Sequence, residues 1–229
     1  MMGSDMDQWW VRHAATRRAW LAHCSLLALG LGTAGAKGAT RDRSPARLLV
    51  VGDSLSAEYG IARGSGWVAL LEKRLGREGI AASVVNASIS GDTTSGGRSR
   101  LPGLLKQHRP THVLIELGGN DALRGLPLGM TRDNLAAMVR LSREAGAKVL
   151  LLGMQVPPNY GRKYGEDFAA LFATVARQGG AALVPFFLEG VANAANAEAM
   201  FQPDRIHPVA QAHPVMLDNV WPVLAPLLK

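Results

Sequence analysis

From Arg47 onward, apolar runs of strand length alternate with segments in which apolar residues recur at helical spacing. The apolar runs are RLLVV (47–51), ASVVNAS (82–88), THVLIEL (111–117), KVLLLGM (148–154) and AALVPFF (181–187). The helical segments begin near residues 66, 95, 131 and 165, and a last one ends in VWPVLAPLLK. Because strand and helix alternate five times, the sequence predicts a parallel sheet of five strands.

Strands this uniformly apolar are buried on both faces of a sheet, which requires helices on both sides. The pattern therefore predicts the α/β class and a three-layer α/β/α sandwich with right-handed crossovers. The second helical segment contains Pro102, where we expect the helix to kink or restart. Ligands in such sheets bind beyond the carboxyl ends of the strands, so the chemistry is expected there.

The first 36 residues have a different pattern. Charged residues up to Arg18 give way to the apolar stretch AWLAHCSLLALGLGTAGA, which ends in small residues. This plan predicts a cleaved secretory signal peptide at 1–36, with Ala34-Gly35-Ala36 at the cleavage site, and hence a periplasmic or secreted protein. TRRAWL (16–21) also resembles a twin-arginine export signal, although Trp20 stands where Phe is usual.

Two other interpretations of this segment have less support. A retained membrane anchor would need a longer apolar stretch, and this one contains His23 and Cys24. A lipoprotein signal at LAHC (21–24) is disfavoured because apolar sequence continues past the cysteine. Cys24 is the only cysteine, and the predicted cleavage removes it. We therefore expect neither a cysteine nucleophile nor a thiolate zinc site in the mature chain.

Length and composition favour one domain. A chain of 229 residues, 48% of them hydrophobic, can bury one core, and we place that domain at 47–229 after a short linker at 37–46. The net charge of +7 is spread over single residues, without the basic patches and interleaved aromatics of a nucleic-acid-binding protein. We therefore expect solvated surface charge, no nucleic-acid partner and no stable membrane anchor.

Polar residues follow the carboxyl end of each predicted strand. The loops are GDSLS (52–56), NASISGDTTSGG (86–97), GGND (118–121) and QVPPNYG (155–161), and QPDRIHP (202–208) precedes the last helix. Together they supply one hydroxyl, one glycine-rich turn, one carboxamide and one Asp-x-x-His pair. These are the groups that acyl transfer through a serine requires.

A serine hydroxyl needs a base, and a neutral imidazole needs an acceptor on its other nitrogen. His207 can be the base for Ser54, and Asp204, three residues earlier, can hold the imidazole in the required tautomer. The oxyanion has three candidate donors, namely the backbone N–H groups of Ser54 and Gly91 and the side-chain amide of Asn120. Four separate loops thus contribute to one predicted catalytic site.

Each of these residues also has a structural interpretation. Asp53 or Ser54 can cap a helix after the first strand, a role compatible with a catalytic hydroxyl on Ser54. Gly91 can be a turn glycine that adopts positive φ. Asn120 can cap the next helix, and His207 can be an ordinary loop histidine. The joint occurrence of the four loops favours catalysis, with Asp53 in a supporting role.

Two functional alternatives stay open at this point. A metal-dependent phosphohydrolase would use the four acids near one sheet edge, Asp53, Asp92, Asp121 and Asp204. A non-catalytic flavodoxin-like binding module would use the segment 91–97 to cradle a phosphate or flavin at a helix N-terminus. Of the four acids, only Asp204 is tied locally to a histidine.

The motifs GDSLS, SISGDTTSGG, GGND and DRIHP resemble, in this order, the four sequence blocks of the SGNH (GDSL) hydrolases, over nearly all of 47–229. GDSLSAEYG, LGGNDALRG, PPNYG and LDNVWPVLAPLL further resemble the bacterial periplasmic thioesterase, lysophospholipase and arylesterase subgroup. The resemblance implies a flavodoxin-like fold, no metal or organic cofactor, and a monomer. It also implies hydrolysis of acyl esters and thioesters, including lysophospholipids, through an acyl-enzyme.

By this resemblance Ser54 is the nucleophile, Asp204 and His207 complete the triad, and Ser54, Gly91 and Asn120 form the oxyanion hole. Within the hydrolase interpretation, we expect aliphatic residues of 155–165 and 188–201 to line an acyl groove.

Three positions depart from the subgroup's pattern. Arg205 stands where Gly is common, Val209 where a small polar residue is common, and His213 where Gln is common. None belongs to the predicted triad. The resemblance therefore does not extend to the lip of the site, and it implies no substrate preference there.

Overall fold

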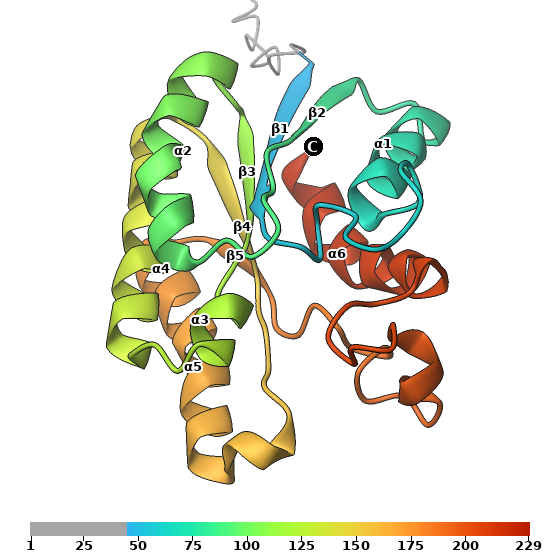
Figure 1. Ribbon diagram of the computed structural model, residues 1–229. Coiled ribbons are helices and arrows are strands. Elements are labelled where there is room, and N and C mark those ends of the chain that lie inside the picture. Colours follow the sequence, from blue (N-terminus) through green and yellow to red (C-terminus); the bar gives the residue numbers. More distant parts are fainter. Residues whose placement is uncertain (1–44) are drawn as a thin grey trace, which may run out of the picture. The chain divides into compact units, whose positions relative to one another are not determined.

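Five parallel strands form one sheet in the computed structural model, which describes residues 45–229 (Figure 1). The strands are β1 (Ala46–Gly52), β2 (Ala82–Asn86), β3 (His112–Glu116), β4 (Lys148–Leu152) and β5 (Ala182–Val184). Their spatial order is β2-β1-β3-β4-β5, which is the flavodoxin-like order. The predicted fold class is confirmed. The signal peptide predicted at 1–36, with Cys24, lies outside the described residues, as does most of the linker predicted at 37–46.

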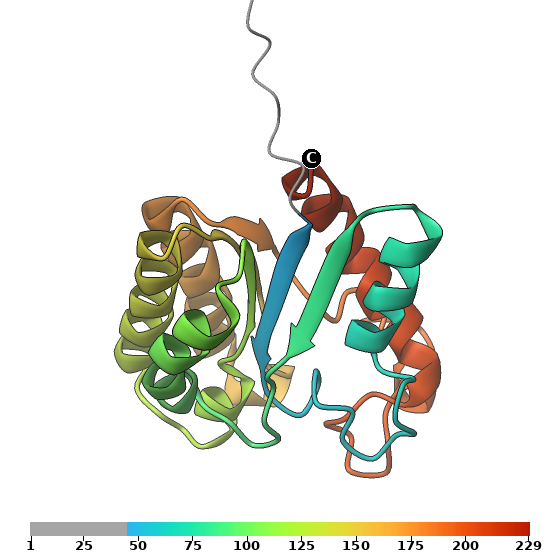
Figure 2. The ribbon, with the colours of Figure 1, turned by 90° about the horizontal axis from the view of Figure 1, so that it is seen from above.

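Helices cover both faces of this sheet (Figures 1 and 2). On one face α4 (Leu128–Glu144) packs between α2 (Thr94–His108) and α5 (Arg162–Gly179), and on the other α1 (Trp67–Arg77) packs against α6 (His213–Leu227). The apolar spacing along α1 explains its orientation, because Trp67, Leu71 and Leu75 are all buried. These three layers are the predicted sandwich.

The strands β1 and β3, which pair with each other, are deeply buried. All five residues of β3 are buried, whereas the edge strand β2 is only partly so. The parallel register pairs Gly52 of β1 with Glu116 of β3. The loops after β1 and β3 therefore leave the sheet at neighbouring points. The core includes the fully buried rings of Trp67 and Phe187, each contributing about 1.5–3 kcal/mol by leaving water.

The last strand is shorter than predicted. β5 ends at Val184, because Pro185 has no backbone N–H to continue the ladder. The chain still follows its neighbour, since the backbone N–H of Phe187 donates to the carbonyl of Gly153 at 2.8 Å. A Cβ on Gly153 would lie 2.3 Å from the carbonyl oxygen of Pro185, so only glycine permits this approach. The apolar residues of 185–187 thus fill the core without extending the strand.

One helix continues through a proline, and another was not predicted from the sequence. The helix α2 runs through Pro102 without a restart, and its N-cap Thr93 accepts a hydrogen bond from the backbone N–H of Gly96 at 3.3 Å. GGND is not a simple loop, because α3 (Gly119–Leu123) begins within it. The preceding Gly118 has a φ of 120°, a conformation that favours glycine. Asn120 therefore lies inside a short helix and does not cap a longer one.

The helix-cap interpretation of Asp53 and Ser54 is wrong. Residues 54–60 form consecutive turns, in which the backbone N–H of Ala57 donates to the carbonyl of Asp53 at 2.9 Å. The helix α1 begins only at Trp67, after Gly66. Ser54 thus lies in a tight turn at the end of β1.

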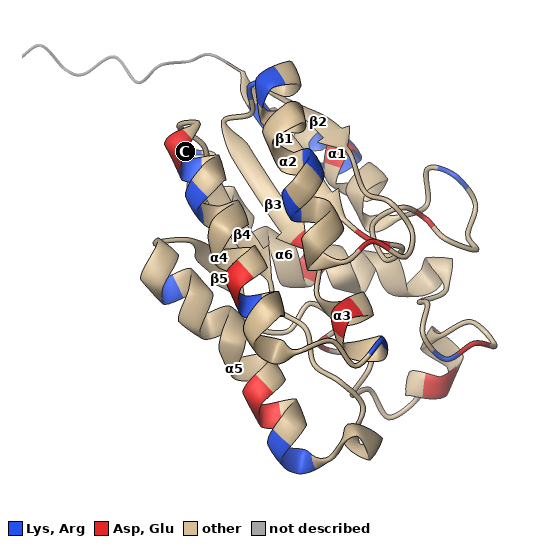
Figure 3. Ribbon diagram, turned by 60° about the vertical axis from the view of Figure 1, so that its left-hand side comes forward, with Lys and Arg blue, Asp and Glu red and all other residues tan. Residues whose placement is uncertain are grey.

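Most charged residues lie on the helices and loops around the sheet (Figure 3). At the start of α5, Arg162 and Lys163 pair with Glu166 and Asp167 one turn later, at 3.3 and 2.8 Å. Such exposed pairs contribute little to stability, because water and salt screen the two charges. This supports the predicted interpretation of the charge as solvated surface. Within residues 45–229, no helix combines the length and the apolar character needed to cross a membrane.

Candidate active site

The side chains of Ser54, His207 and Asp204 form one hydrogen-bonded chain. Nε2 of His207 lies 2.9 Å from Oγ of Ser54, and Nδ1 lies 2.7 Å from Oδ2 of Asp204. Because a carboxylate only accepts, Nδ1 carries the proton donated to Asp204, and Nε2 is left to accept the hydroxyl proton of Ser54. The structure therefore brings the three predicted triad residues together in the predicted order.

The loop that carries Asp204 and His207 is closed by its own backbone. The N–H of Gln202 donates to the carbonyl of His207 at 2.8 Å. Oδ1 of Asp204 accepts from the backbone N–H groups of Ile206 and His207, at 2.9 and 3.0 Å. This tight turn is the physical reason that an offset of three residues places the carboxylate beside the imidazole.

The same contacts keep Asp204 ionised. Hydrogen bonds from the backbone and then the side chain of His207, followed by the backbone of Ile206, lower the pKa of Asp204 from 3.8 to about 2. The carboxylate is therefore negative at neutral pH. It can stabilise the positive charge that His207 acquires when it takes a proton from Ser54.

Tyr59 ties the turn after β1 to the catalytic loop, a contact that the sequence did not reveal. Its ring centroid lies 4.3 Å from that of His207, and its carbonyl accepts from Nε2 of Gln202 at 2.9 Å. The only available signal was its position in GDSLSAEYG. These contacts restrain the His207 ring near Ser54.

Two of the three predicted oxyanion donors, Ser54 and Asn120, line the same cavity. Among residues 45–229, no protein atom accepts from the backbone N–H of Ser54, which leaves it available to a substrate. Nδ2 of Asn120 donates one hydrogen to Oδ2 of Asp53 at 2.9 Å. Its second amide hydrogen has no acceptor among residues 45–229, so it is available to a ligand in the cavity.

The third predicted donor, Gly91, lies beside the site but does not line the cavity. Its loop follows the end of β1, because the backbone N–H of Ile89 donates to the carbonyl of Gly52 at 3.0 Å. Arg124 holds the loop from the other side, through a 2.7 Å hydrogen bond to the Gly91 carbonyl. The φ of Gly91 is +77°, so its turn role and its predicted donor role are compatible.

The buried side chain of Asp53 contacts both the turn after β1 and the amide of Asn120. It is 2% exposed, and its Oδ1 accepts from the backbone N–H of Leu55 at 3.0 Å. Burial raises the pKa of Asp53 to about 6, although the hydrogen bonds from Leu55 and Asn120 oppose that effect. Asp53 thus has the supporting role expected from the sequence.

A cavity of about 470 Å³ opens beside Ser54 and His207. Much of its lining is apolar and comes from the two predicted stretches and from neighbouring loops, including Met154, Val156, Pro157, Pro158, Phe186, Leu188, Ala192 and Phe201. Tyr160 is not part of this lining and stacks on Tyr164 with a centroid distance of 6.0 Å. The cavity is suited to an acyl chain whose carbonyl reaches Ser54.

Only one of the three departures from the subgroup pattern lies at this cavity. Arg205 lines it, whereas Val209 and His213 do not. His213 is 2% exposed, and its Nδ1 accepts from the backbone N–H of Trp67 at 3.0 Å. Burial lowers its pKa to about 4, so it is neutral at pH 7. His213 therefore satisfies a free N–H at the start of α1.

The four acids proposed for a metal site have separate partners. Asp53 accepts from Asn120, Asp92 pairs with Arg100 at 2.8 Å, Asp121 accepts from the backbone N–H of Thr94 at 2.9 Å, and Asp204 pairs with His207. In the part of the chain that the structure describes, no three His, Cys, Asp or Glu residues form a group able to hold a metal ion. The phosphohydrolase alternative is not supported.

The binding-module alternative fails at the start of α2. A phosphate there would need free backbone N–H groups. The N–H of Thr94 already donates to Asp121, and that of Gly96 donates to Oγ1 of Thr93. Two of the backbone N–H groups at the start of α2 are thus already bound by the protein's own acceptors.

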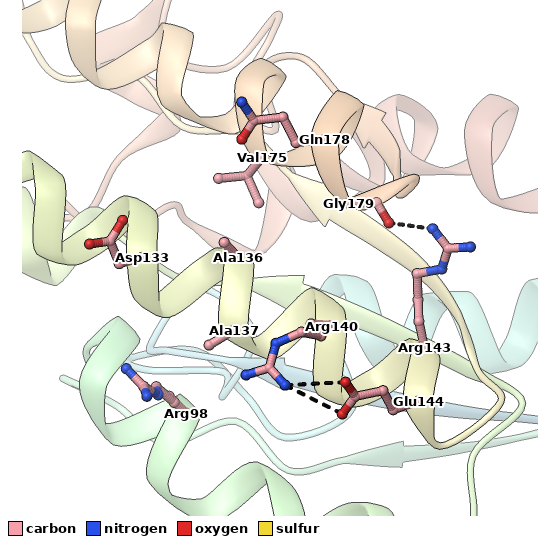
Figure 4. Close-up of a pocket in the computed structure, with 10 residues that line it drawn as sticks. All are labelled: Arg98, Asp133, Ala136, Ala137, Arg140, Arg143, Glu144, Val175, Gln178 and Gly179. Carbon is pink, nitrogen blue, oxygen red and sulfur yellow. Dashed lines mark hydrogen bonds and ion pairs between the residues drawn. The ribbon is translucent and has the colours of Figure 1, made fainter.

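A second hollow, of about 700 Å³, lies between α2, α4 and α5 and contains no predicted site residue (Figure 4). Its charged groups are largely engaged by neighbours. Arg140 pairs with Glu144 at 3.2 Å, Nη1 of Arg98 donates to Asn134 at 3.1 Å, and Arg143 donates to the Gly179 carbonyl. This hollow offers no group for acyl transfer.

Comparison with known proteins is consistent with this geometry. Residues 50–215 match the model of the GDSL-like lipase/acylhydrolase family. The chain is 54% identical over 189 residues to the esterase TesA of Pseudomonas aeruginosa, covering 82% of this chain and 92% of that protein. It is 43% identical over 182 residues to thioesterase 1/protease 1/lysophospholipase L1 of Escherichia coli K12, covering 80% of this chain and 85% of that protein.

Solved structures give the same picture. A crystal structure of TesA is 56% identical, with a TM-score of 0.76, and the match covers 79% of this chain and 99% of that one. The esterase EstA from Pseudoalteromonas sp., inhibited by monoethylphosphonate, is 39% identical with a TM-score of 0.74, covering 80% of this chain and 98% of that one.

Proposed function

This chain belongs to the GDSL-like lipase/acylhydrolase family, and from that premise we propose that Ser54 is the nucleophile of an acyl-transfer cycle completed by His207 and Asp204. The protein is a serine hydrolase of acyl esters and thioesters. The observation that carries the assignment of residues is the continuous chain of hydrogen bonds from Ser54 through His207 to Asp204, at 2.9 and 2.7 Å.

In the first half of the cycle, Oγ of Ser54 attacks the acyl carbonyl while Nε2 of His207 takes the hydroxyl proton. The backbone N–H groups of Ser54 and Gly91 and the amide of Asn120 stabilise the oxyanion, each typically contributing about 2.7–4 kcal/mol to the transition state. His207 then returns the proton to the departing alcohol or thiol. An acyl-enzyme ester on Ser54 remains.

In the second half, water replaces the leaving group. His207 removes a proton from that water, which attacks the acyl carbonyl through the same oxyanion site. The bond to Ser54 breaks, and His207 returns the proton to Oγ, so that the free acid leaves. The cycle needs only these side chains and water.

The substrate class follows from the relatives and the cavity. Relatives named esterase, arylesterase, thioesterase and lysophospholipase span aryl, thiol and lipid leaving groups. We propose that the acyl chain enters the apolar cavity of about 470 Å³, while the leaving group stays at its open side. Lysophospholipids are included in this class.

The proposal extends to the whole chain. Residues 1–36 direct export and are then removed. Residues 37–46 form a short linker, and residues 47–229 are a monomeric enzyme in the periplasm or outside the cell. The sequence of the leader supports this part of the proposal. Mass spectrometry of the protein from a periplasmic extract, together with light scattering, tests both the cleavage and the oligomeric state.

Labelling with a fluorophosphonate tests the nucleophile. We expect one phosphonyl adduct per molecule, located on the peptide that contains Ser54, and loss of p-nitrophenyl ester hydrolysis in proportion to labelling. Treatment with EDTA should leave the activity unchanged. An adduct on another serine with full loss of activity would contradict the assignment.

A further inference from the structure

The carboxyl group of Glu116 lies in the interior behind the candidate active site, and the cycle above gives it no role. It is the last residue of β3 and is 0% exposed. The register places it opposite Gly52, one residue before Asp53. A charged residue at the end of the apolar run THVLIEL is costly to bury unless neighbouring groups bind it or it is neutral.

Two donors from the turn after β1 converge on this carboxyl. Oε2 of Glu116 accepts from Oγ of Ser56 at 2.7 Å and from the backbone N–H of Asp53 at 3.3 Å. Nε1 of Trp67 in turn donates to Oγ of Ser56 at 3.0 Å, which fixes the hydroxyl. Asp53 continues the chain of contacts to Nδ2 of Asn120 at 2.9 Å.

We propose that Glu116 is a positioning residue that, through Asp53, fixes the Asn120 amide in the orientation needed at the oxyanion. This inference rests on the proposed function, because it assumes that Asn120 is an oxyanion donor. Glu116 itself does not line the substrate cavity, whereas Asp53 and Asn120 do.

We expect Glu116 and Asp53 to hold one proton between them, mainly on Glu116. Oε1 of Glu116 has no hydrogen-bond partner among residues 45–229, which disfavours a carboxylate at that position. Burial, and then the charge of Asp53, raise the pKa of Glu116 well above its ordinary range. The proton therefore stays on Glu116, and Asp53 carries the negative charge when the pH is above about 6.

This division of charge determines how Asn120 is oriented. An ionised Asp53 only accepts hydrogen bonds, so it selects the orientation of Asn120 in which Nδ2, and not Oδ1, faces the carboxylate. The second hydrogen on Nδ2 is then available to the oxyanion. If Asp53 were displaced, the amide could rotate and present its oxygen to the developing negative charge.

Glu116→Met and Glu116→Gln separate this role from a structural one. Methionine fills a similar volume without polar atoms, whereas glutamine keeps an acceptor for Ser56 and for the backbone N–H of Asp53. We expect Glu116→Met to lower kcat for a p-nitrophenyl ester roughly tenfold with little change in KM. The Asn120 amide would then point away from the oxyanion part of the time, so part of its stabilisation of the transition state would be lost. Glu116→Gln should keep most of kcat.

The concentration of active sites is titrated with fluorophosphonate, and kcat is calculated from that concentration. Misfolded protein then does not lower the measured kcat. Ser142→Ala is the control, because Ser142 is a buried hydroxyl in α4 without a partner among the described residues. It should leave kcat unchanged. If Glu116→Met yields no folded protein, Ser56→Ala removes one of the two donors to Oε2 and should also lower kcat, but by a smaller factor.

The decisive experiment combines Glu116→Met with Asn120→Ala. If Glu116 acts through Asn120, Glu116→Met should cause no further loss of kcat once the amide is absent. An equal loss in both backgrounds, or an unchanged kcat in the single variant, would overturn the inference while leaving the proposed function intact. If Asn120→Ala alone retains full kcat, the oxyanion assignment fails and this inference fails with it.

Discussion

Nε2 of His207 lies 2.9 Å from Oγ of Ser54, although 153 residues separate them in the sequence. Ser54 stands in the turn after the interior strand β1, and His207 stands in the closed loop before α6. The contact between Gln202 and the carbonyl of Tyr59 joins these two segments directly. The distance between Ser54 and His207 therefore depends on how the sheet and these two loops fold together.

Asp204→Asn should lower kcat by roughly 10²- to 10⁴-fold, because an amide can no longer enforce the required tautomer of His207. The mutation should also remove a contribution to stability. The pKa of Asp204 falls from 3.8 to about 2 on folding, so its contribution is present above pH 3.8 and is lost as the pH falls toward 2. Urea unfolding at pH 7 and pH 3 should show a smaller difference between variant and parent at pH 3; an equal difference would contradict this.

His213→Gln should make the protein more resistant to acid. The pKa of His213 falls from 6.5 to about 4 on folding, so the unfolded state binds its proton first and the parent loses stability as the pH drops between these values. The loss is up to about 3 kcal/mol. Glutamine does not titrate and can still accept from Trp67. Free energies of unfolding measured at pH 7 and pH 4.5 should show a weaker pH dependence in the variant, and an identical dependence would rule out this role for His213.

Asp53→Asn should stabilise the fold at neutral pH while impairing catalysis. The pKa of Asp53 rises from 3.8 to about 6, so folding is penalised as the pH rises from 3.8 through 6, where the unfolded state is already ionised. Relative to the parent, the variant should gain up to about 3 kcal/mol between pH 4 and pH 7. Chemical unfolding at both pH values measures this gain. A variant that loses stability relative to the parent over that range would show that the charge of Asp53 is not penalised.

Ala192→Phe should shorten the preferred acyl chain, because Ala192 lines the cavity beside Ser54 and a ring there occupies part of it. We expect kcat/KM to fall by about tenfold or more for dodecanoyl esters and to change little for acetyl esters. A series of p-nitrophenyl esters measures both. Ala199→Phe is the matched control, since Ala199 is exposed in a neighbouring 3-10 helix outside the cavity lining. Equal losses for all chain lengths would place the acyl chain elsewhere.

Local patterns predicted most of the fold and the triad. The apolar runs identified all five strands, and the spacing of Asp204 and His207 was sufficient to pair them. Contacts between distant segments were not visible in the same way. Nothing near His213 in the sequence indicates that it binds the backbone of Trp67, 146 residues away.

The departures from prediction have similar causes. β5 ends early because Pro185 has no backbone N–H to donate to the sheet. The prediction followed the apolar run through residue 187 and did not take this proline into account. Glu116 was included in an apolar run without a role, because its meaning depends on Ser56 and Asp53 from another strand end. Tertiary hydrogen bonds therefore account for most of what the sequence pattern did not show.

The most direct test of the central claim is the turnover of Ser54→Ala measured with both a p-nitrophenyl ester and an acyl thioester. Because the hydroxyl is the proposed attacking group for both bonds, we expect kcat to fall by about 10⁴-fold or more for each, with an unchanged circular dichroism spectrum. A folded variant that retains the parent's kcat for either substrate would contradict the assignment of Ser54 as the nucleophile.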